Sequence, residues 1–317
     1  MVLEDLKVPL KVLDAAADAL SDELKKAMTQ AKQNIEKFHC AQKTSKIELT
    51  TQAGVHCWQE KRPIEKVGLY IPGGSAPLFS TIMMLAIPAQ IAGCQERILC
   101  TPPNEKGDVD PAILYAAQLC SVTKIYRVGG IQAIAAMTLG TASIPKVYKI
   151  FGPGNQFVTA AKQWATKFQV AIDLPAGPSE LLVAADATSN PNYVAADLLS
   201  QAEHGPDSQV VLVSTSSSLI EAVLKAIDVQ LEQLPRKEIA TKALENSKTI
   251  LVASDTAAID LINAYAPEHY IIMTENEQEY VDGVQNAGSV FIGAYTPAVS
   301  YTHLRAHETR GNLVCRL

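Results

Sequence analysis

An apolar segment, Val67-Gly68-Leu69-Tyr70-Ile71-Pro72-Gly73-Gly74, is followed by a helical pattern from Leu78 to Ala92. A short, continuous apolar run that ends at proline and glycine is typical of a buried strand. A buried helix directly after such a strand predicts a β-α-β unit. Parallel sheets made of such units are covered on both faces, so their strands are apolar throughout.

The same alternation of strand and helix continues along the chain. Helices are expected between the strands, among them Pro111–Leu119, Ile131–Leu139 and one from Gln156. Nine strands are expected, at Val67–Ile71, Arg97–Thr101, Lys124–Val128, Lys149–Phe151, Leu181–Val183, Gln209–Val213, Thr249–Val252, Tyr270–Met273 and Ser289–Ile292. They divide near residues 155–180, which predicts an α/β protein with two doubly wound, Rossmann-like parallel-sheet lobes.

The predicted domains follow from this pattern. Residues 1–60 hold an amphipathic helix near Leu20 to Phe38 and an extended segment around Ile47 to Trp58. Residues 61–170 form the first lobe, on the dinucleotide side, and residues 171–297 form the second, on the metal and substrate side.

Residues 298–317 differ from the rest of the chain. Residues 301–317 contain three arginines and no lysine, whereas residues 1–300 contain 4 arginines and 20 lysines. The segment from Tyr301 to Leu317 shows neither a strand period nor a helix period. We therefore expect a disordered tail that is foreign to the protein, such as a frame-shifted or chimeric end; an ordinary exposed tail is the alternative.

Composition excludes several classes of protein. The 317 residues carry 27 basic and 33 acidic side chains, a net charge of −6, and 48% of them are hydrophobic. Nucleic-acid binding and intrinsic disorder are therefore not expected. The uncharged stretch from Gly68 to Gln95 is long enough for a membrane span, but Pro72, Pro77 and Pro88 divide it, so no membrane association is expected. Six cysteines without a CxxC pair indicate reduced thiols and a cytoplasmic location.

Three loops rich in glycine and proline are candidate ligand sites, at Pro72–Ser75, Phe151–Asn155 and Pro175–Glu180. Glycine lets backbone amides approach a ligand closely, and a helix that begins after the loop favours anions. Gln132 lies in the first turn of a further helix after Gly129-Gly130. In doubly wound folds ligands bind at the carboxyl ends of the strands, so the chemistry is expected at those ends in both lobes. Ordinary turns explain such loops equally well.

Gln201 and His204 are three residues apart on an expected helix and therefore share a face, as two metal ligands must. Neutral imidazole is a good zinc ligand, whereas a glutamine oxygen is unusual. The alternative is a simple helix end, with His204 near the negative pole of the helix dipole and Gly205-Pro206 stopping the helix.

Glu268 and His269 stand directly before the strand Tyr270–Met273. One could take a substrate proton while the other activates water. A surface turn that happens to contain both residues is the alternative.

Together, these motifs closely resemble histidinol dehydrogenases, the enzymes of the last step of histidine biosynthesis. The resemblance rests on Gly68–Gly74, Phe151–Asn155, Pro175–Glu180, Ser200–Ser208 and Pro267–His269, and it covers about Leu20 to Pro297. It implies an NAD-dependent, zinc-dependent, four-electron oxidation of L-histidinol through L-histidinaldehyde to L-histidine, carried out by a homodimer.

The resemblance also implies roles for single residues. Glu268 and His269 match the catalytic pair, with His269 also touching substrate, and Ser179 matches a substrate-binding position. Gln201 and His204 match two Zn²⁺ ligands that also contact substrate. The positions that match the lining of the NAD site are Tyr70, Gln132 and Asn155.

The chain departs from the family after Pro297. The family continues there with a segment that supplies an aspartate and a histidine as further zinc ligands, whereas this chain reads Ala298-Val299-Ser300-Tyr301. His303 and His307 lie outside any family motif. The chain is therefore expected to be the middle of the enzyme, and an inactive dinucleotide-binding fragment is the alternative function. A non-catalytic module that binds a sugar or amino acid is supported by the fold alone.

Overall fold

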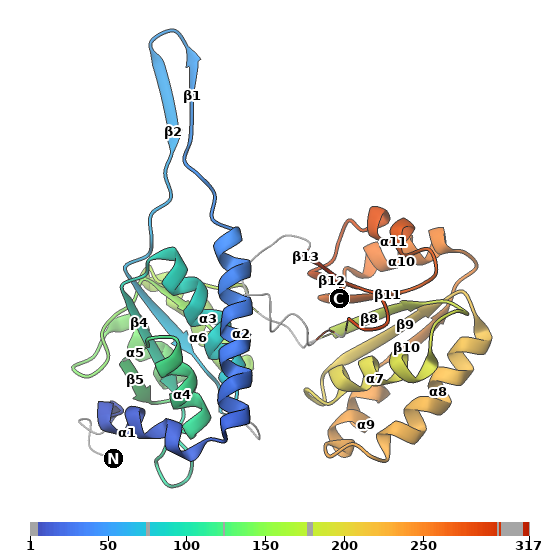
Figure 1. The fold of residues 1–317 in the computed structure, drawn as a ribbon, viewed down its shortest axis with the longest axis horizontal. Coiled ribbons are helices and arrows are strands. Elements are labelled where there is room, and N and C mark those ends of the chain that lie inside the picture. Colours follow the sequence, from blue (N-terminus) through green and yellow to red (C-terminus); the bar gives the residue numbers. More distant parts are fainter. Residues whose placement is uncertain are drawn as a thin grey trace. The chain divides into compact units, whose positions relative to one another are not determined.

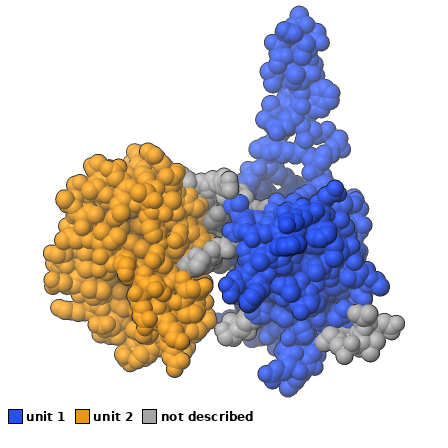
Figure 2. Space-filling view, turned by 180° about the vertical axis from the view of Figure 1, so that it is seen from behind, with its two compact units in different colours: residues 1–176, 302–308 blue, residues 177–301, 309–317 orange. Residues whose placement is uncertain are grey.

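The nine expected strands are all present and form two parallel sheets (Figure 1). The computed structural model describes residues 6–73, 77–122, 124–175, 180–296, 298 and 313–316. The chain divides into two compact units, residues 1–176 with 302–308 and residues 177–301 with 309–317 (Figure 2). Each unit is built around one of the sheets, which confirms the predicted fold of two doubly wound lobes.

The sheet of the first unit has the strand order β5-β4-β3-β6-β7, and all its pairs are parallel. The strands are β3 (Lys66–Tyr70), β4 (Glu96–Thr101), β5 (Lys124–Arg127), β6 (Lys149–Phe151) and β7 (Ala171–Ile172). The sequence did not predict β7, because two residues are too few to show a periodic pattern.

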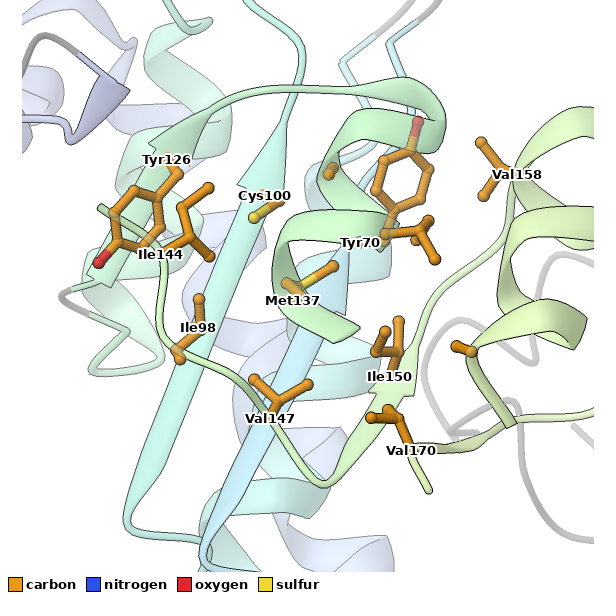
Figure 3. Packing of buried hydrophobic residues seen from close by; sticks show 13 residues of the cluster. Tyr70, Ile98, Cys100, Tyr126, Met137, Ile144, Val147, Ile150, Val158 and Val170 are labelled. Carbon is orange, nitrogen blue, oxygen red and sulfur yellow. The ribbon is translucent and has the colours of Figure 1, made fainter. Parts of the chain in front are cut away.

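Helices cover both faces of this sheet. One layer contains α3 (Phe79–Ala92) and α4 (Pro111–Leu119), and the other contains α5 (Gly130–Leu139) and α6 (Gln156–Ala165). Figure 3 shows the core under α5, where Met137 packs among Tyr70, Ile98 and Ile150. A Cβ on Gly68 would lie 2.6 Å from the Met137 sulfur, so glycine in β3 lets α5 lie close to the sheet.

The uncharged stretch is a buried strand followed by a buried helix, as expected. Residues Ile82–Ile87 of α3 are all buried, and the helix ends at Gly93, whose φ of +90° is a left-handed conformation that glycine adopts easily. None of the helices in the described part of the chain has the length and hydropathy that crossing a membrane requires.

The N-terminal segment is helical before it becomes extended. A short helix α1 (Leu10–Asp14), a 3-10 helix (Ala15–Ala19) and the long helix α2 (Asp22–Ala41) pack on the first unit. The expected extended segment is an antiparallel hairpin of β1 (Ile47–Gln52) and β2 (Val55–Gln59), which projects from the unit (Figure 1).

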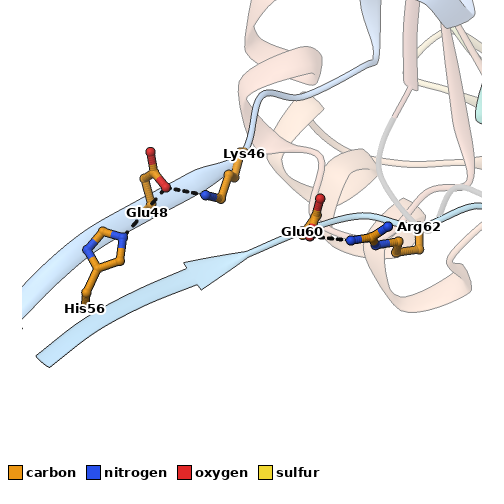
Figure 4. Close-up of polar contacts among 5 residues, drawn as sticks. All are labelled: Lys46, Glu48, His56, Glu60 and Arg62. Carbon is orange, nitrogen blue, oxygen red and sulfur yellow. Dashed lines mark hydrogen bonds and ion pairs between the residues drawn. The ribbon is translucent and has the colours of Figure 1, made fainter.

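All strand residues of the hairpin are exposed, and its polar side carries Glu48, Thr50 and His56 together with Trp58. Strand alternation puts Ile47, Leu49 and Val55 on the same face. On the polar side, the Glu48 carboxylate lies 2.5 Å from the Lys46 ammonium and 3.8 Å from His56 Nε2 (Figure 4).

The second sheet has the order β10-β9-β8-β11-β12-β13. Its strands are β8 (Glu180–Ala185), β9 (Gln209–Ser214), β10 (Lys248–Leu251), β11 (His269–Met273), β12 (Ser289–Ile292) and β13 (Leu313–Arg316). The first five strands repeat the order found in the first unit, with the earliest strand in the middle. That order makes the places between β3 and β6, and between β8 and β11, the topological switch points of the two sheets.

The second sheet is also covered on both faces (Figure 1). The helices α7 (Pro191–Ala202), α8 (Ser217–Leu231) and α9 (Lys237–Glu245) pack on one face. On the other face, α10 (Asp255–Tyr265) and α11 (Glu277–Gly283) cover a core that contains Leu182, Ala184, Tyr270 and Ile272.

The expectation that no regular element follows Tyr301 is wrong at one place. The strand β13 pairs in parallel with β12. Its four residues include the apolar run Leu313-Val314-Cys315, which is too short to be recognised as a strand from the sequence. Apart from Ala298 and β13, residues 297–317 lie outside the described residues.

Candidate functional site

The switch point of the first sheet brings two of the predicted ligand loops together. Tyr70 is the last residue of β3, and Gly152 directly follows β6, the neighbouring strand. Gly152 has a φ of +129°, and a Cβ there would collide with the carbonyl oxygen of Tyr70. Only glycine fits here, because the two loops meet backbone to backbone.

Tyr70 also reaches the third loop of this edge. Its buried hydroxyl oxygen accepts a hydrogen bond of 3.0 Å from the backbone N–H of Gly130, the first residue of α5. Burial raises the pKa of Tyr70, so the phenol remains protonated and its O–H stays available as a donor. Gln132 lies two residues further in the first turn of α5, where it is exposed.

Asn155 occupies the N-cap of α6. Its side-chain oxygen accepts hydrogen bonds of 3.1 Å from the N–H groups of Phe157 and Val158, and the residue is exposed. The positive pole of the α6 dipole therefore lies beside the Gly152 loop, as anion binding requires. Tyr70, Gln132 and Asn155, the three predicted cofactor residues, thus lie on connected loops at one edge.

In the second unit the predicted residues lie at the opposite edge of the sheet. Gln201 and His204 lie at the end of α7, which connects β8 to β9 and therefore runs against the strand direction. Glu268 and His269 stand where β11 begins. Both pairs are at the amino ends of the strands, so the expectation that they lie at the carboxyl ends is wrong. The rule that ligands bind at the carboxyl ends concerns loops that follow strands. The candidate residues of the second unit instead lie where strands begin.

His269 points to the face of the sheet that α7 covers. Tyr270 and Ile272 pack against α10 and α11 on the other face, and strand residues alternate between faces. His269 is 5% exposed, and its Nδ1 lies 3.2 Å from the carbonyl oxygen of Glu180. Because a carbonyl only accepts, Nδ1 carries the proton and Nε2 carries the lone pair that a general base needs.

Glu268 is held by its backbone, whereas its carboxylate is accessible. The Glu268 N–H donates to Glu180 Oε1 at 3.2 Å, and the Glu268 carbonyl accepts from the N–H of Ser289 at 2.8 Å. Its side chain is 42% exposed and lies 3.9 Å from His269 Nδ1. An accessible carboxylate beside a buried imidazole can take a proton from water.

Glu180 is a positioning residue that the sequence reasoning missed. Its carboxylate accepts from the Glu268 N–H and from the Tyr265 hydroxyl at 3.0 Å, and its carbonyl faces His269. Its place at the end of the loop Pro175–Glu180 was the available signal. Ser179, in the same loop, lies outside the described residues.

The pair Gln201 and His204 offers two donors for a metal ion. His204 Nδ1 lies 2.8 Å from the Ser200 carbonyl, so its proton is on Nδ1 and Nε2 is left as the ligand atom on an exposed ring. Gln201 is 4% exposed, and its buried Nε2 has no hydrogen-bond partner in the described part of the chain. Among the residues that the structure describes, no three His, Cys, Asp or Glu side chains form a metal-binding group. The pair therefore fits half of a zinc site.

One turn before Gln201 on α7 lies a further buried acid, Asp197. Its residue is 7% exposed, and burial raises the pKa of its carboxyl group to about 7.

The buried cysteines do not suit nucleophilic chemistry. Burial raises the pKa of Cys100 and of Cys120 to about 12, so neither forms the thiolate that nucleophilic attack needs. The free cysteines of the described chain include Cys94, which is also buried.

At the carboxyl ends of the strands in the second sheet, an acidic side chain of the chain itself bonds backbone N–H groups beside the switch point. Asp186 follows β8, and its carboxylate accepts from the N–H groups of Thr188 at 2.9 Å and Glu275 at 2.7 Å. Glu275 lies just beyond the end of β11. This carboxylate thus occupies backbone donors of the kind that bind ligand anions.

Comparison with known proteins gives one consistent family. The sequence profile described as histidinol dehydrogenase matches residues 1–304. The histidinol dehydrogenase of Bacteroides thetaiotaomicron is 59% identical over 297 residues, covering 94% of this chain and 69% of that relative. The one of Escherichia coli K12 is 53% identical over 294 residues, covering 92% and 67%.

A solved structure agrees with the sequence matches. The crystal structure of histidinol dehydrogenase from Elizabethkingia anophelis has a TM-score of 0.93 and 54% sequence identity, covering 95% of this chain and 70% of that chain. The profile match begins at residue 1 and reaches residue 304, so the similarity is wider than the stretch from Leu20 to Pro297 that the motifs indicated.

Proposed function

Because the chain belongs to the histidinol dehydrogenase family, we propose that it carries the NAD-dependent, zinc-dependent oxidation of L-histidinol to L-histidine through L-histidinaldehyde. The observation that supports this most directly is the geometry at His269. Its Nδ1 proton faces the Glu180 carbonyl, which leaves Nε2 as the base, and the accessible carboxylate of Glu268 lies 3.9 Å from Nδ1 of the same ring.

The two residues divide the proton transfers. In the first oxidation, His269 Nε2 takes the proton of the substrate hydroxyl. In the second, the Glu268 carboxylate takes a proton from the water that adds to the aldehyde, so that the hydrate can be oxidised to the acid. NAD, when bound, accepts a hydride in each oxidation, and two molecules are used per substrate.

The cofactors are assigned to different units. NAD would be held at the first switch point, with Tyr70, Gln132 and Asn155 on the three loops that meet there. Zinc, when bound through Gln201 and His204, would hold the amino alcohol for oxidation, and Ser179 would contact the substrate. The two donors fit zinc, but a catalytic zinc normally needs a third protein ligand.

We further propose that the enzyme works as a cytoplasmic homodimer. The exposed apolar face of the β1–β2 hairpin, with Ile47, Leu49 and Val55, supports this, because a lone two-stranded hairpin has little stability in water. A second subunit would cover that face.

The deciding experiment follows NADH formation with histidinol. The 317-residue chain is compared with a chimera in which residues 1–296 are joined to the rest of the Bacteroides thetaiotaomicron relative. Oxidation of histidinol by the chimera, with two NADH formed per histidine, supports the proposal. A chimera that binds zinc and NAD but does not oxidise histidinol contradicts it.

A second candidate is a dinucleotide-binding chain without activity. The absence of a three-residue metal group from the described residues favours it. The same assay separates the two, because this candidate predicts NADH binding by the 317-residue chain without turnover.

A further inference from the structure

A buried ion pair in the first unit is not explained by the catalytic chemistry. It joins Lys162 of α6 to Asp173, which directly follows β7, and each side chain is only 6% exposed. Burying two charges is costly, and apolar side chains of similar size often give equal or higher stability. The stability of the fold alone therefore does not account for the pair.

Both members of the pair bind the backbone of one glycine. The N–H of Gly152 donates to Asp173 Oδ2 at 2.7 Å, and Lys162 Nζ donates to the carbonyl oxygen of Gly152 at 2.8 Å. The pair thus fixes the two peptide groups on either side of the Gly152 Cα. This is the residue whose φ of +129° brings β6 against the backbone of Tyr70.

The fixed glycine begins the loop that leads to Asn155. Two residues separate Gly152 from this N-cap, and Lys162 lies on the helix that Asn155 caps, so α6 holds the loop from which it starts. From Gly152 the contacts continue to Tyr70 and through its hydroxyl to Gly130.

We propose that the Lys162–Asp173 pair positions the loop Gly152–Asn155 for dinucleotide binding, an inference that rests on the NAD site proposed above. Both are positioning residues, because they act on the ligand through the backbone of Gly152. Hydrogen bonds from the two charged groups to the N–H and the carbonyl of Gly152 hold the loop in one conformation. The dinucleotide therefore does not have to order the loop when it binds.

A double variant separates this role from a structural one. Lys162→Met with Asp173→Leu removes both charges and keeps side chains of similar length. We expect a lower melting temperature, because the N–H and the carbonyl of Gly152 lose their buried partners, but still a folded chain, because no unpaired charge remains. The dissociation constant for NADH, measured by its fluorescence, should rise about 10- to 100-fold, because the loop is no longer held in place.

Two further variants sharpen the test. Lys162→Met with Asp173→Asn keeps an acceptor for the Gly152 N–H, so its affinity for NADH should fall less than that of the first variant. Glu96→Gln with Lys124→Met removes a pair of 2.5 Å at the amino ends of β4 and β5, in the same unit. This control should bind NADH as the parent does.

The outcomes are distinguishable. If the parent binds NADH and both Lys162 double variants bind it equally tightly, the inference is wrong while the proposed NAD site stands. If the parent does not bind NADH, the proposed NAD site is wrong, and so is the inferred role of the pair in dinucleotide binding. Hydrogen exchange of the Gly152 amide without ligand then shows whether the pair holds the loop. If the Leu-containing variant does not fold, the Asn-containing one decides, and unchanged affinity for NADH overturns the inference.

Discussion

At the scale of single residues, the pair Glu268 and His269 gives the sharpest prediction. In the active chimera, His269→Asn should lower the rate of histidinol oxidation by about 10²- to 10⁴-fold, the usual effect of a positioned base. Glu268→Gln should mainly slow the oxidation of histidinaldehyde, because it removes the group that activates water. NADH formation from each substrate separates the two steps. Equal loss on both substrates in His269→Asn, with no effect of Glu268→Gln, would contradict these roles.

The buried Asp197 predicts a pH dependence of stability. Burial raises its pKa from 3.8 to about 7. Between these values the folded protein keeps a proton that the unfolded chain has released, so this carboxyl lowers the free energy of unfolding as pH rises from about 4 to 7. Above pH 7 the loss is constant, because the carboxyl is ionised in both states.

Asp197→Asn should remove this loss. The variant should be more stable than the parent at pH 8, by up to a few kcal/mol, and nearly equal to it at pH 4. Urea unfolding at several pH values measures the difference. Asp228→Asn, at an exposed position of α8, is the control that should leave the slope unchanged. The same slope in the Asp197 variant and the parent would show that another group is responsible.

At the scale of secondary structure elements, the start of α6 separates capping from cofactor binding. Asn155→Ala should lower the free energy of unfolding by about 1 kcal/mol, because it removes the cap. Asn155→Asp keeps the cap and suits the helix dipole, but its charge would repel a pyrophosphate. Its stability should therefore be retained while its affinity for NADH falls.

The control for this prediction is Asn190→Asp at the N-cap of α7, whose side chain accepts from the Asn192 N–H at 2.9 Å. It should leave NADH affinity unchanged. Undiminished NADH binding by Asn155→Asp would remove Asn155 from the cofactor site.

The β1–β2 hairpin tests the proposed dimer. Ile47→Lys with Leu49→Lys puts charges on its apolar face, so the molar mass measured by light scattering should fall to that of one chain. Thr50→Lys with His56→Lys charges the opposite face at a polar pair and should leave the mass unchanged. A parent chain that is itself monomeric, or a dimer that survives the first change, would contradict the assignment of this face.

At the scale of the whole molecule, the strands could be predicted because each is a short apolar run that ends at a turn. The amino-end position of the candidate residues in the second unit is also readable from the sequence, because Glu268 directly precedes a strand and Gln201 ends a helix, and the general rule about carboxyl ends does not apply to such residues. The role of Glu180 depends on contacts with β11 and α10, which are distant in sequence. Likewise, nothing in the sequence pairs Lys162 with Asp173.

The two units also predict the stoichiometry of cofactor binding. At the second switch point, the Asp186 carboxylate already accepts the N–H groups of Thr188 and Glu275, whereas the proposed NAD residues lie at the first. Titration should therefore give one NADH per chain, and Asn155→Asp should weaken that single event. Two equivalent NADH molecules per chain would mean that the second sheet binds a dinucleotide as well.

The carboxylate of Asp186 has a consequence for protein design. This carboxylate bonds backbone N–H groups at the carboxyl ends of the strands in the second sheet, while Gln201, Glu268 and His269 lie at their amino ends. The same sheet therefore has two places where functional residues can be introduced, the carboxyl ends and the amino ends of its strands. Residues can be changed at either place without altering the strand order. In a designed protein, an aspartate in a turn could bond the backbone N–H groups at one end of the strands, while new catalytic residues are placed at the other end.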